Sequence, residues 1–162
     1  MRSRGHRVSI FIDDSRVLGR SAAGACAAAK LLFVLFDRCG FVLNEKKSMK
    51  PEEAAQKVKY LGFWIDTRTF QVTAPEEKLA SIVDITNGLR SDTRWPVRRW
   101  ASLHGKLVSL KASHGTRTLV TSRPLAIAVD EHTKKYGWGK RVYLCNTEEI
   151  MVGLKIFLQY MH

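Results

Sequence analysis

The sequence has few cysteines, and their arrangement excludes a zinc knuckle and a disulfide between Cys26 and Cys39. Only Cys26, Cys39 and Cys145 occur among 162 residues, and none of them forms a Cys-x-x-Cys pair. Cys26 and Cys39 fall in one expected helix, 13 positions and therefore about 20 Å apart, which is too far for a disulfide. We therefore expect no zinc knuckle. We also expect the protein to reside in an intracellular, reducing compartment such as the cytoplasm or nucleus.

Long apolar runs and phosphate-loop chemistry are also missing. The apolar run over residues 31–36 is too short to span a bilayer, and the basic start is not followed by a signal-peptide core. Gly19 and Gly24 have the spacing of a phosphate-binding loop, but Gly24-Ala25-Cys26 stands where that loop needs Gly-Lys-Ser or Gly-Lys-Thr. The sequence contains neither an internal repeat nor a low-complexity linker.

Acidic residues are scarce relative to basic ones. The chain has 27 Lys and Arg against 15 Asp and Glu, a net charge of +12, with 45% hydrophobic residues, which is typical of a globular protein. A surplus of basic residues spread along the chain indicates a polyanionic partner, of which nucleic acid is the first candidate. The alternative is a basic protein whose charge only keeps it soluble. We expect no membrane partner, because no single helix carries the whole surplus on one face.

Two adjacent carboxylates follow the apolar, β-branched stretch over residues 8–12. The chain then resumes with Arg16-Val17-Leu18, so the pattern predicts a β-hairpin with Asp13 and Asp14 at its tip. Placed there, the two carboxylates form a concentrated oxygen site of the kind that Mg²⁺ prefers. An ordinary solvated turn is the alternative.

The first half otherwise predicts one helix and short strands. Ser21 and Gly40 suit the two ends of a helix over residues 22–39. Strands are expected at 41–43, 58–65 and 70–72, with a basic turn over 44–51. Gly62, inside the second of these strands, indicates a bulge or the close approach of another backbone.

The second half predicts helices. Pro75 suits the first position of a helix with apolar residues at Leu79, Ile82, Val83, Ile85 and Leu89. A helix from about Pro96 has an apolar stripe at Trp100, Leu103, Leu107 and Leu110, while its other sides carry Arg98, Arg99, Lys106 and Lys111. That basic side is either solvated or a binding surface.

Three further segments complete the predicted elements. A helix is expected over about 117–136, where Pro124 marks a break or a fresh start. Residues 140–144 look extended, and Asn146 with Glu149 has the form of a capping box before a helix that reaches His162. Together the elements predict an α+β protein.

Five segments resemble, in order, those of retroelement reverse transcriptases, and most closely those of DIRS-like (tyrosine-recombinase) retrotransposons. Residues 11–14 are similar to the [Y/F]-x-D-D catalytic hairpin, 40–48 to a GF-x-L-N-x-x-K-S segment, and 58–63 to the YLGF primer grip. Residues 74–78 and 103–107 resemble the thumb helices. The helix that begins at Glu148-Glu149 looks like the entry to a ribonuclease H-like region.

The resemblance implies a partial polymerase palm followed by a helical thumb. Its parts would be the C-terminal part of the palm over 1–73, a thumb-like region over 74–136, and the start of a connection or ribonuclease H-like region over 137–162. Such enzymes join nucleotides by two-metal phosphoryl transfer with Mg²⁺ ions about 4 Å apart. The implied partners are an RNA/DNA primer–template duplex and a dNTP; no oligomeric state is predicted.

The resemblance also implies a role for each candidate residue. Asp13 would be a metal ligand and Asp14 a secondary ligand or electrostatic group. Lys47 would offset charge on the nucleotide phosphates. Tyr60, Leu61 and Gly62 would hold the primer backbone, although a plain buried edge strand is the alternative. The duplex phosphates would be contacted by Arg98, Arg99, Lys106 and Lys111, without sequence preference.

One departure from the family limits the expected activity. A further catalytic aspartate of the family lies on a strand before the Asp-Asp hairpin, and only seven residues precede Val8 here. We therefore expect half of a palm plus a thumb, inactive as an isolated chain. The two functions left open are a fragment of an RNA-directed DNA polymerase and a non-catalytic retroelement remnant that only binds nucleic acid.

Overall fold

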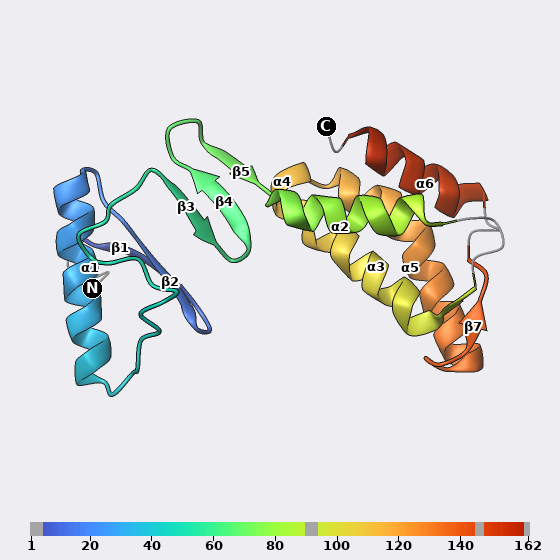
Figure 1. Ribbon diagram of the computed structural model, residues 1–162, viewed down its shortest axis with the longest axis horizontal. Helices are drawn as coiled ribbons and strands as arrows, with labels where there is room; N and C mark the ends of the chain where they lie inside the picture. Colours follow the sequence, from blue (N-terminus) through green and yellow to red (C-terminus); the bar gives the residue numbers. More distant parts are fainter. Residues whose placement is uncertain (1–4, 90–93, 145–147, 161–162) are drawn as a thin grey trace. The chain divides into compact units, whose positions relative to one another are not determined.

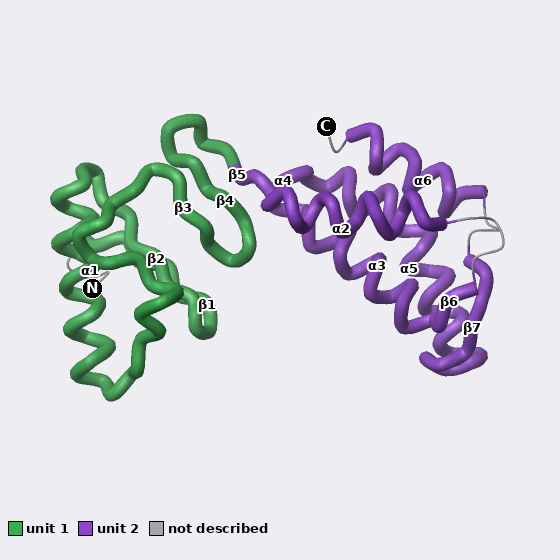
Figure 2. Tube along the Cα trace, in the orientation of Figure 1, with its two compact units in different colours: residues 1–71 green, residues 72–162 purple. Residues whose placement is uncertain are grey.

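The chain divides into two compact units, Met1–Gln71 and Val72–His162 (Figure 2). The computed structural model describes residues 5–89, 94–144 and 148–160. Helices and small antiparallel sheets both occur in it, which confirms the expected α+β class. The helical residues 74–136 and the described residues after them belong to the same unit.

Unit 1 combines two small sheets with one long helix (Figure 1). Its elements are β1 (Arg7–Phe11), β2 (Asp14–Leu18), α1 (Ala22–Arg38), β3 (Lys57–Tyr60) and β4 (Phe63–Asp66), and β5 (Gln71–Thr73) crosses the boundary between the units. The first sheet is the antiparallel pair β1-β2, and the second has the order β3-β4-β5. The predicted hairpin around Asp13 and Asp14 is confirmed.

The ends of α1 explain why the strand predicted over 41–43 does not form. Ser21 caps the start, where its Oγ accepts a hydrogen bond from the Gly24 N–H at 3.1 Å, as the sequence predicts. At the other end Gly40 adopts a φ of +77°, and the Phe41 N–H donates to the Phe36 carbonyl at 2.9 Å. The two Phe rings also meet edge to face, with centroids 5.6 Å apart. Phe41 therefore closes the helix and is not part of a sheet.

The single strand predicted over 58–65 is wrong, because the chain reverses in its middle. Tyr60 pairs with Phe63, so Leu61 and Gly62 form a two-residue turn with φ values of +50° and +74°. Two positive φ values are typical of a type I′ hairpin turn. No atom lies within 4 Å of a Cβ built at Gly62, so glycine serves the turn and not a bulge or a close approach. The next strand begins at Gln71, one residue later than predicted.

Unit 2 is mainly helical (Figure 1). Its elements are α2 (Glu76–Asn87), β6 (Trp95–Pro96), α3 (Val97–Ser109), α4 (Lys111–His114), α5 (Arg117–Tyr136), β7 (Arg141–Val142) and α6 (Glu148–Gln159). The short strands β6 and β7 pair antiparallel, which places the predicted extended segment beside the start of α3. Asn146 of the predicted capping box lies outside the described residues.

The core of unit 2 forms around the apolar stripe of α3. Trp100, Leu103, Leu107 and Leu110 are each at most 1% exposed, which confirms the predicted buried face. Burial of a large apolar side chain stabilises a fold by about 1.5–3 kcal/mol, so this stripe is a principal source of stability. α3 packs against α5, and α5 packs in turn against α6.

Pro124 does not interrupt α5, whose bounds agree with the prediction. The helix continues through this residue for its full length, from Arg117 to Tyr136. A proline removes the hydrogen bond to the carbonyl four residues earlier, here that of Val120. Because Val120 is 71% exposed, solvent can replace the missing donor.

Unit 1 has a much smaller core than unit 2. The large residues that it buries are Val8, Leu32 and Tyr60, while Phe11, Ile12 and Val42 are among the apolar residues that it exposes. Cys26 and Cys39 are free thiols, and Cys145 lies outside the described residues. None of the described helices is long and apolar enough to cross a membrane.

The approach of α6 to α5 gives a stability prediction. A Cβ built at Gly153 would overlap the carbonyl oxygen of Thr121, whereas one built at Gly105 in α3 meets no atom within 4 Å. We expect Gly153→Ala to destabilise the fold by about 1–3 kcal/mol through overpacking. Gly105→Ala should instead stabilise it by about 0.5–1 kcal/mol through helix propensity. Urea unfolding of the full chain measures both; equal shifts in the two variants would contradict this packing.

Candidate functional site

The two predicted metal ligands lie at an exposed hairpin turn. Phe11 pairs with Asp14, so Ile12 and Asp13 form a two-residue turn and Asp14 is the first residue of β2. Both carboxylates are exposed to solvent. The predicted hairpin forms, with Asp13 in its turn and Asp14 not in the turn but in the strand that follows it.

The turn has a strained residue beside the carboxylates. Ile12 adopts a φ of +52° and is 86% exposed. A β-branched residue rarely has a positive φ, and two-residue turns of this kind usually contain Gly, Asn or Asp there. Such a conformation costs about 1–3 kcal/mol and is often found at functional sites. Leu61 and Phe70 have φ values of +50° and +54° as well, so it is the adjacent carboxylates, more than the strain, that make this turn the first candidate site in unit 1.

The donor chemistry of the turn fits Mg²⁺, but for one ion only. Mg²⁺ is commonly held by one or two carboxylates together with water and phosphate oxygens. Asp13 and Asp14 supply two such carboxylates. No group of three or more His, Cys, Asp and Glu side chains gathers anywhere in the described part of the chain. A pair of ions would therefore need further ligands.

Tyr60 connects the second hairpin to the first. Its Oη lies 3.3 Å from the Ser9 Oγ, and the Arg16 guanidinium lies over its ring at 4.7 Å from the centroid. Ser9 and Arg16 face each other across β1 and β2, so the ring rests on one cross-strand pair. The Tyr60 side chain is buried within unit 1, while Leu61 and Gly62 are exposed in the turn.

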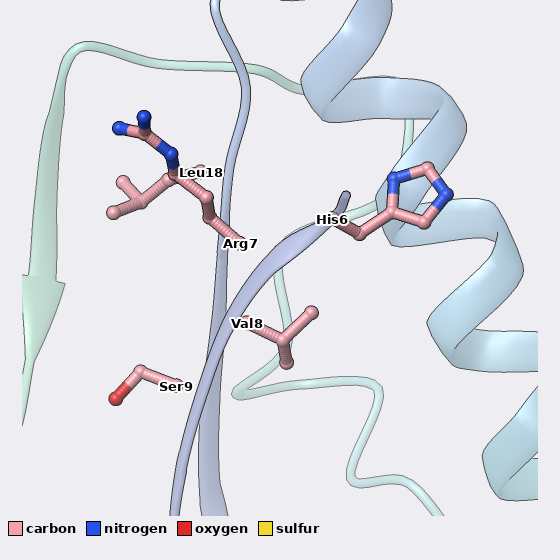
Figure 3. Close-up of a pocket in the computed structure, with 5 residues that line it drawn as sticks. All are labelled: His6, Arg7, Val8, Ser9 and Leu18. Atoms are coloured by element: carbon pink, nitrogen blue, oxygen red, sulfur yellow. The ribbon is translucent and has the colours of Figure 1, made fainter. Parts of the chain in front are cut away.

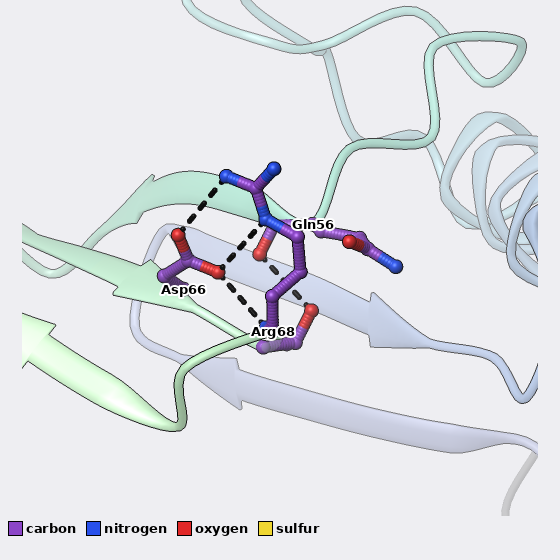
Figure 4. Close-up of polar contacts among 4 residues, drawn as sticks. Gln56, Asp66 and Arg68 are labelled. Carbon is purple, nitrogen blue, oxygen red and sulfur yellow. Dashed lines mark hydrogen bonds and ion pairs between the residues drawn. The ribbon is translucent and has the colours of Figure 1, made fainter.

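The base of the second hairpin is fixed by a local polar cluster (Figure 4). The Arg68 N–H donates to Asp66 Oδ1 at 2.8 Å, and its guanidinium pairs with Oδ2 at 3.3 Å. The side-chain hydrogen bond from Arg68, followed by its backbone hydrogen bond, lowers the pKa of Asp66 below its ordinary value. Thr67 donates from both N and Oγ1 to the Gln56 carbonyl. The cluster is exposed, so it orients the hairpin more than it stabilises it.

Lys47 is not brought into contact with the carboxylates. It lies in an exposed turn in which its N–H donates to the Asn44 carbonyl at 3.0 Å. Among the described residues its side chain forms no ion pair or hydrogen bond. Its predicted role toward a phosphate therefore has no geometric counterpart here.

A shallow depression of about 300 Å³ lies at the opposite end of the β1-β2 ladder. His6 and Val8 lie on one side of the strand, and Arg7, Ser9 and Leu18 on the other (Figure 3). Arg7 pairs with Leu18, whereas the carboxylate turn begins beyond the Phe11–Asp14 pair. The depression is therefore separate from the candidate metal site.

The four predicted cations of unit 2 have different environments. Arg98 and Arg99 are exposed at the start of α3, and the Arg99 guanidinium lies over the Trp95 ring at 4.1 Å from the centroid. Lys106 is half-buried and its Nζ donates to the Ser81 Oγ of α2 at 2.6 Å. Lys111 is exposed at the start of α4. Arg99 and Lys106 are seven residues apart on one helix face, a rise of about 10.5 Å.

A second cluster of basic and aromatic residues, around β6 and β7, was not predicted from the sequence. The Arg94 guanidinium lies over the Tyr143 ring at 4.1 Å, and Trp138 is 52% exposed. A signal was available, because residues 134–143 contain four basic and three aromatic residues. This composition is typical of nucleic-acid surfaces, but only the structure places the segment beside Arg98 and Arg99.

Comparison with known protein families, with curated proteins and with solved structures finds no match to this chain.

His104, on α3 between two buried leucines of the stripe, gives a pH prediction. Burial lowers the pKa of its imidazole below the ordinary value of 6.5. The unfolded chain then binds more protons than the folded one as the pH falls. The contribution of neutral His104 to the free energy of unfolding is therefore complete above pH 6.5. It is lost as the pH falls from 6.5 through the folded-state pKa. We expect the thermal midpoint to decline over that range and His104→Gln, which cannot titrate, to reduce the decline. An unchanged decline in the variant would contradict this assignment.

Proposed function

We propose that the chain is part of an RNA-directed DNA polymerase of the reverse transcriptase family, with a metal-binding hairpin in unit 1 and a nucleic-acid-binding unit 2. The contact of Tyr60 with Ser9 and Arg16 carries the proposal. It joins the two segments of unit 1 that resemble the catalytic hairpin and the primer grip, which lie about fifty residues apart in the sequence. The proposal therefore has support from this contact as well as from the resemblance of the two motifs.

In this proposal Asp13 and Asp14 hold a divalent cation at the hairpin turn. A bound Mg²⁺ would supply charge stabilisation to the phosphates during nucleotidyl transfer. Both carboxylates are exposed, and the Phe11–Asp14 pair fixes the turn beside which they lie. In the described part of the chain no third His, Cys, Asp or Glu side chain joins Asp13 and Asp14, so a second ion would need ligands from outside this turn.

The remaining residues of unit 1 would act around the primer. Tyr60 is a positioning residue, since its buried side chain holds the second hairpin on the first. The exposed turn of Leu61 and Gly62 is then the part of the primer-binding segment that a nucleic-acid backbone can reach. Lys47, exposed in its own turn, could approach a phosphate only if that turn lies beside the bound nucleotide.

In unit 2 the exposed cations would contact the phosphates of a duplex. Arg98 and Arg99 present guanidinium groups at one end of α3, and Lys111 presents an ammonium group after its other end. Lys106 would have to exchange its hydrogen bond with Ser81 for a phosphate. Such contacts are independent of base sequence and weaken with added salt.

A nucleic-acid-binding protein without polymerase activity is the second candidate function. It is favoured by one observation, that the described residues gather only two carboxylates at the candidate metal site. The cations of unit 2 require no metal and no nucleotide to bind a phosphate backbone. Both candidate functions predict nucleic-acid binding by unit 2, and they differ at the hairpin turn.

Charge neutralisation in unit 2 tests the shared part of both functions. We expect the four changes Arg98→Gln, Arg99→Gln, Lys106→Gln and Lys111→Gln, made together, to weaken binding to a primer–template duplex. Each phosphate contact that is lost should also flatten the slope of log K against log salt by about 0.9 on a DNA duplex. Fluorescence anisotropy titrations at several salt concentrations measure both quantities.

The matched control removes four other exposed cations. It carries Arg20→Gln, Arg38→Gln, Lys50→Gln and Lys155→Gln, and so has the same net charge as the test variant. An equal loss of binding in the two variants would leave only nonspecific attraction and remove the assigned role of α3. Asp13→Asn with Asp14→Asn should leave duplex binding undiminished, because it removes negative charge.

A further inference from the structure

The β6-β7 ribbon places an exposed tryptophan among the cations at the start of α3. The Val97 N–H donates to the Lys140 carbonyl at 3.0 Å, and the Arg98 N–H donates to the Trp138 carbonyl at 3.1 Å. Pro96 pairs with Arg141 in the ribbon itself. Figure 2 shows β6 and β7 side by side in unit 2. Segments that are about forty residues apart in the sequence therefore form one surface.

This surface, the Trp138 surface, consists of Arg98, Trp138, Lys140 and Arg141. Trp138 is 52% exposed, and the three basic residues are exposed as well. None of these residues is acidic. Two acids, Asp130 and Glu131, lie toward the end of α5, and Glu131 is exposed. There Asp130 is neutralised by Lys134 at 2.7 Å.

On the Trp138 surface an anion would be bound by side chains and not by backbone N–H groups. The first N–H groups of α3 already donate to Lys140 and Trp138, so they are not free to bind a phosphate. Arg98, Lys140 and Arg141 supply the available donors. Arg99 and Arg94 flank the surface with guanidinium groups over the Trp95 and Tyr143 rings. A stacked guanidinium keeps its in-plane N–H groups free to donate.

We propose that the Trp138 surface binds an unpaired strand of nucleic acid, with one base stacked on the Trp138 ring and the flanking phosphates on Arg98 and Lys140. The inference rests on the proposed nucleic-acid function and adds that the ligand at this surface is single-stranded. An exposed aromatic face can stack on a base only if that base is free on at least one side, as in a single strand. Inside a duplex both faces of each base are already covered. A basic groove with an aromatic platform is the usual design of single-strand sites.

The test compares single-stranded and duplex ligands on the full chain. Labelled oligo-dT and a blunt DNA duplex are titrated by anisotropy against the wild type, Trp138→Ala and Trp138→Phe. The control is Trp64→Ala, because Trp64 in β4 is also exposed, at 37%, and has a basic residue close by, with Lys57 Nζ 5.7 Å from its ring centroid. Circular dichroism melts establish that each variant is folded.

We expect Trp138→Ala to weaken oligo-dT binding by about tenfold, within the range of base–aromatic stacking, and to leave duplex binding within about twofold. Trp138→Phe should retain most of the affinity, and Trp64→Ala should change neither ligand. Equal losses for both ligands, or no loss of oligo-dT binding, would overturn the assignment, and so would an equal effect of Trp64→Ala. If the wild type binds neither ligand at low salt, the proposed nucleic-acid function fails together with the Trp138 assignment. If the wild type binds nucleic acid but the variants do not behave as expected, only the Trp138 assignment fails.

Discussion

The burial of Trp100 is the interaction on which the arrangement of unit 2 depends. The side chain is fully buried, donates from Nε1 to the Val142 carbonyl at 3.3 Å, and packs on the Trp95 ring at a centroid distance of 4.7 Å. It thereby fixes the β6-β7 ribbon to α3. Because the ribbon is held there, Arg98 and Trp138 lie on one surface. The Trp138 surface proposed for unit 2 depends on this packing contact together with the backbone hydrogen bonds from Val97 and Arg98 to Lys140 and Trp138.

Unit 1 has a different balance between packing and exposure. Its two hairpins are joined by Tyr60, and its core is small, so residues such as Phe11 and Val42 stay exposed. A two-stranded sheet with exposed apolar residues gains little stability by itself. The carboxylate turn is correspondingly supported by few contacts, and Ile12 retains a strained conformation there. Unit 2 is the better-packed part, and unit 1 carries the candidate metal chemistry.

The sequence predicted features that depend on local pattern and missed those that depend on distant contacts. The stripe around Trp100 and the cap at Ser21 were predictable, because each follows from spacing within one helix. The turn at Leu61 and Gly62 was not, since alternation of side chains looks the same in one long strand and in a tight hairpin. The placement of Trp138 beside Arg98 depends on a ribbon between segments far apart in the sequence, which no local pattern encodes.

The central claim is that Asp13 and Asp14 form a divalent-metal site, and Mn²⁺ titration followed by NMR tests it most directly. Paramagnetic broadening of backbone amide signals locates the bound ion without any need for activity. If these two carboxylates hold the ion, residues 11–16 broaden first, and Asp13→Asn with Asp14→Asn removes this effect. Glu52 and Glu53 are the matched pair of adjacent exposed carboxylates. Broadening centred on that pair, or spread evenly over all acidic residues, would contradict the account.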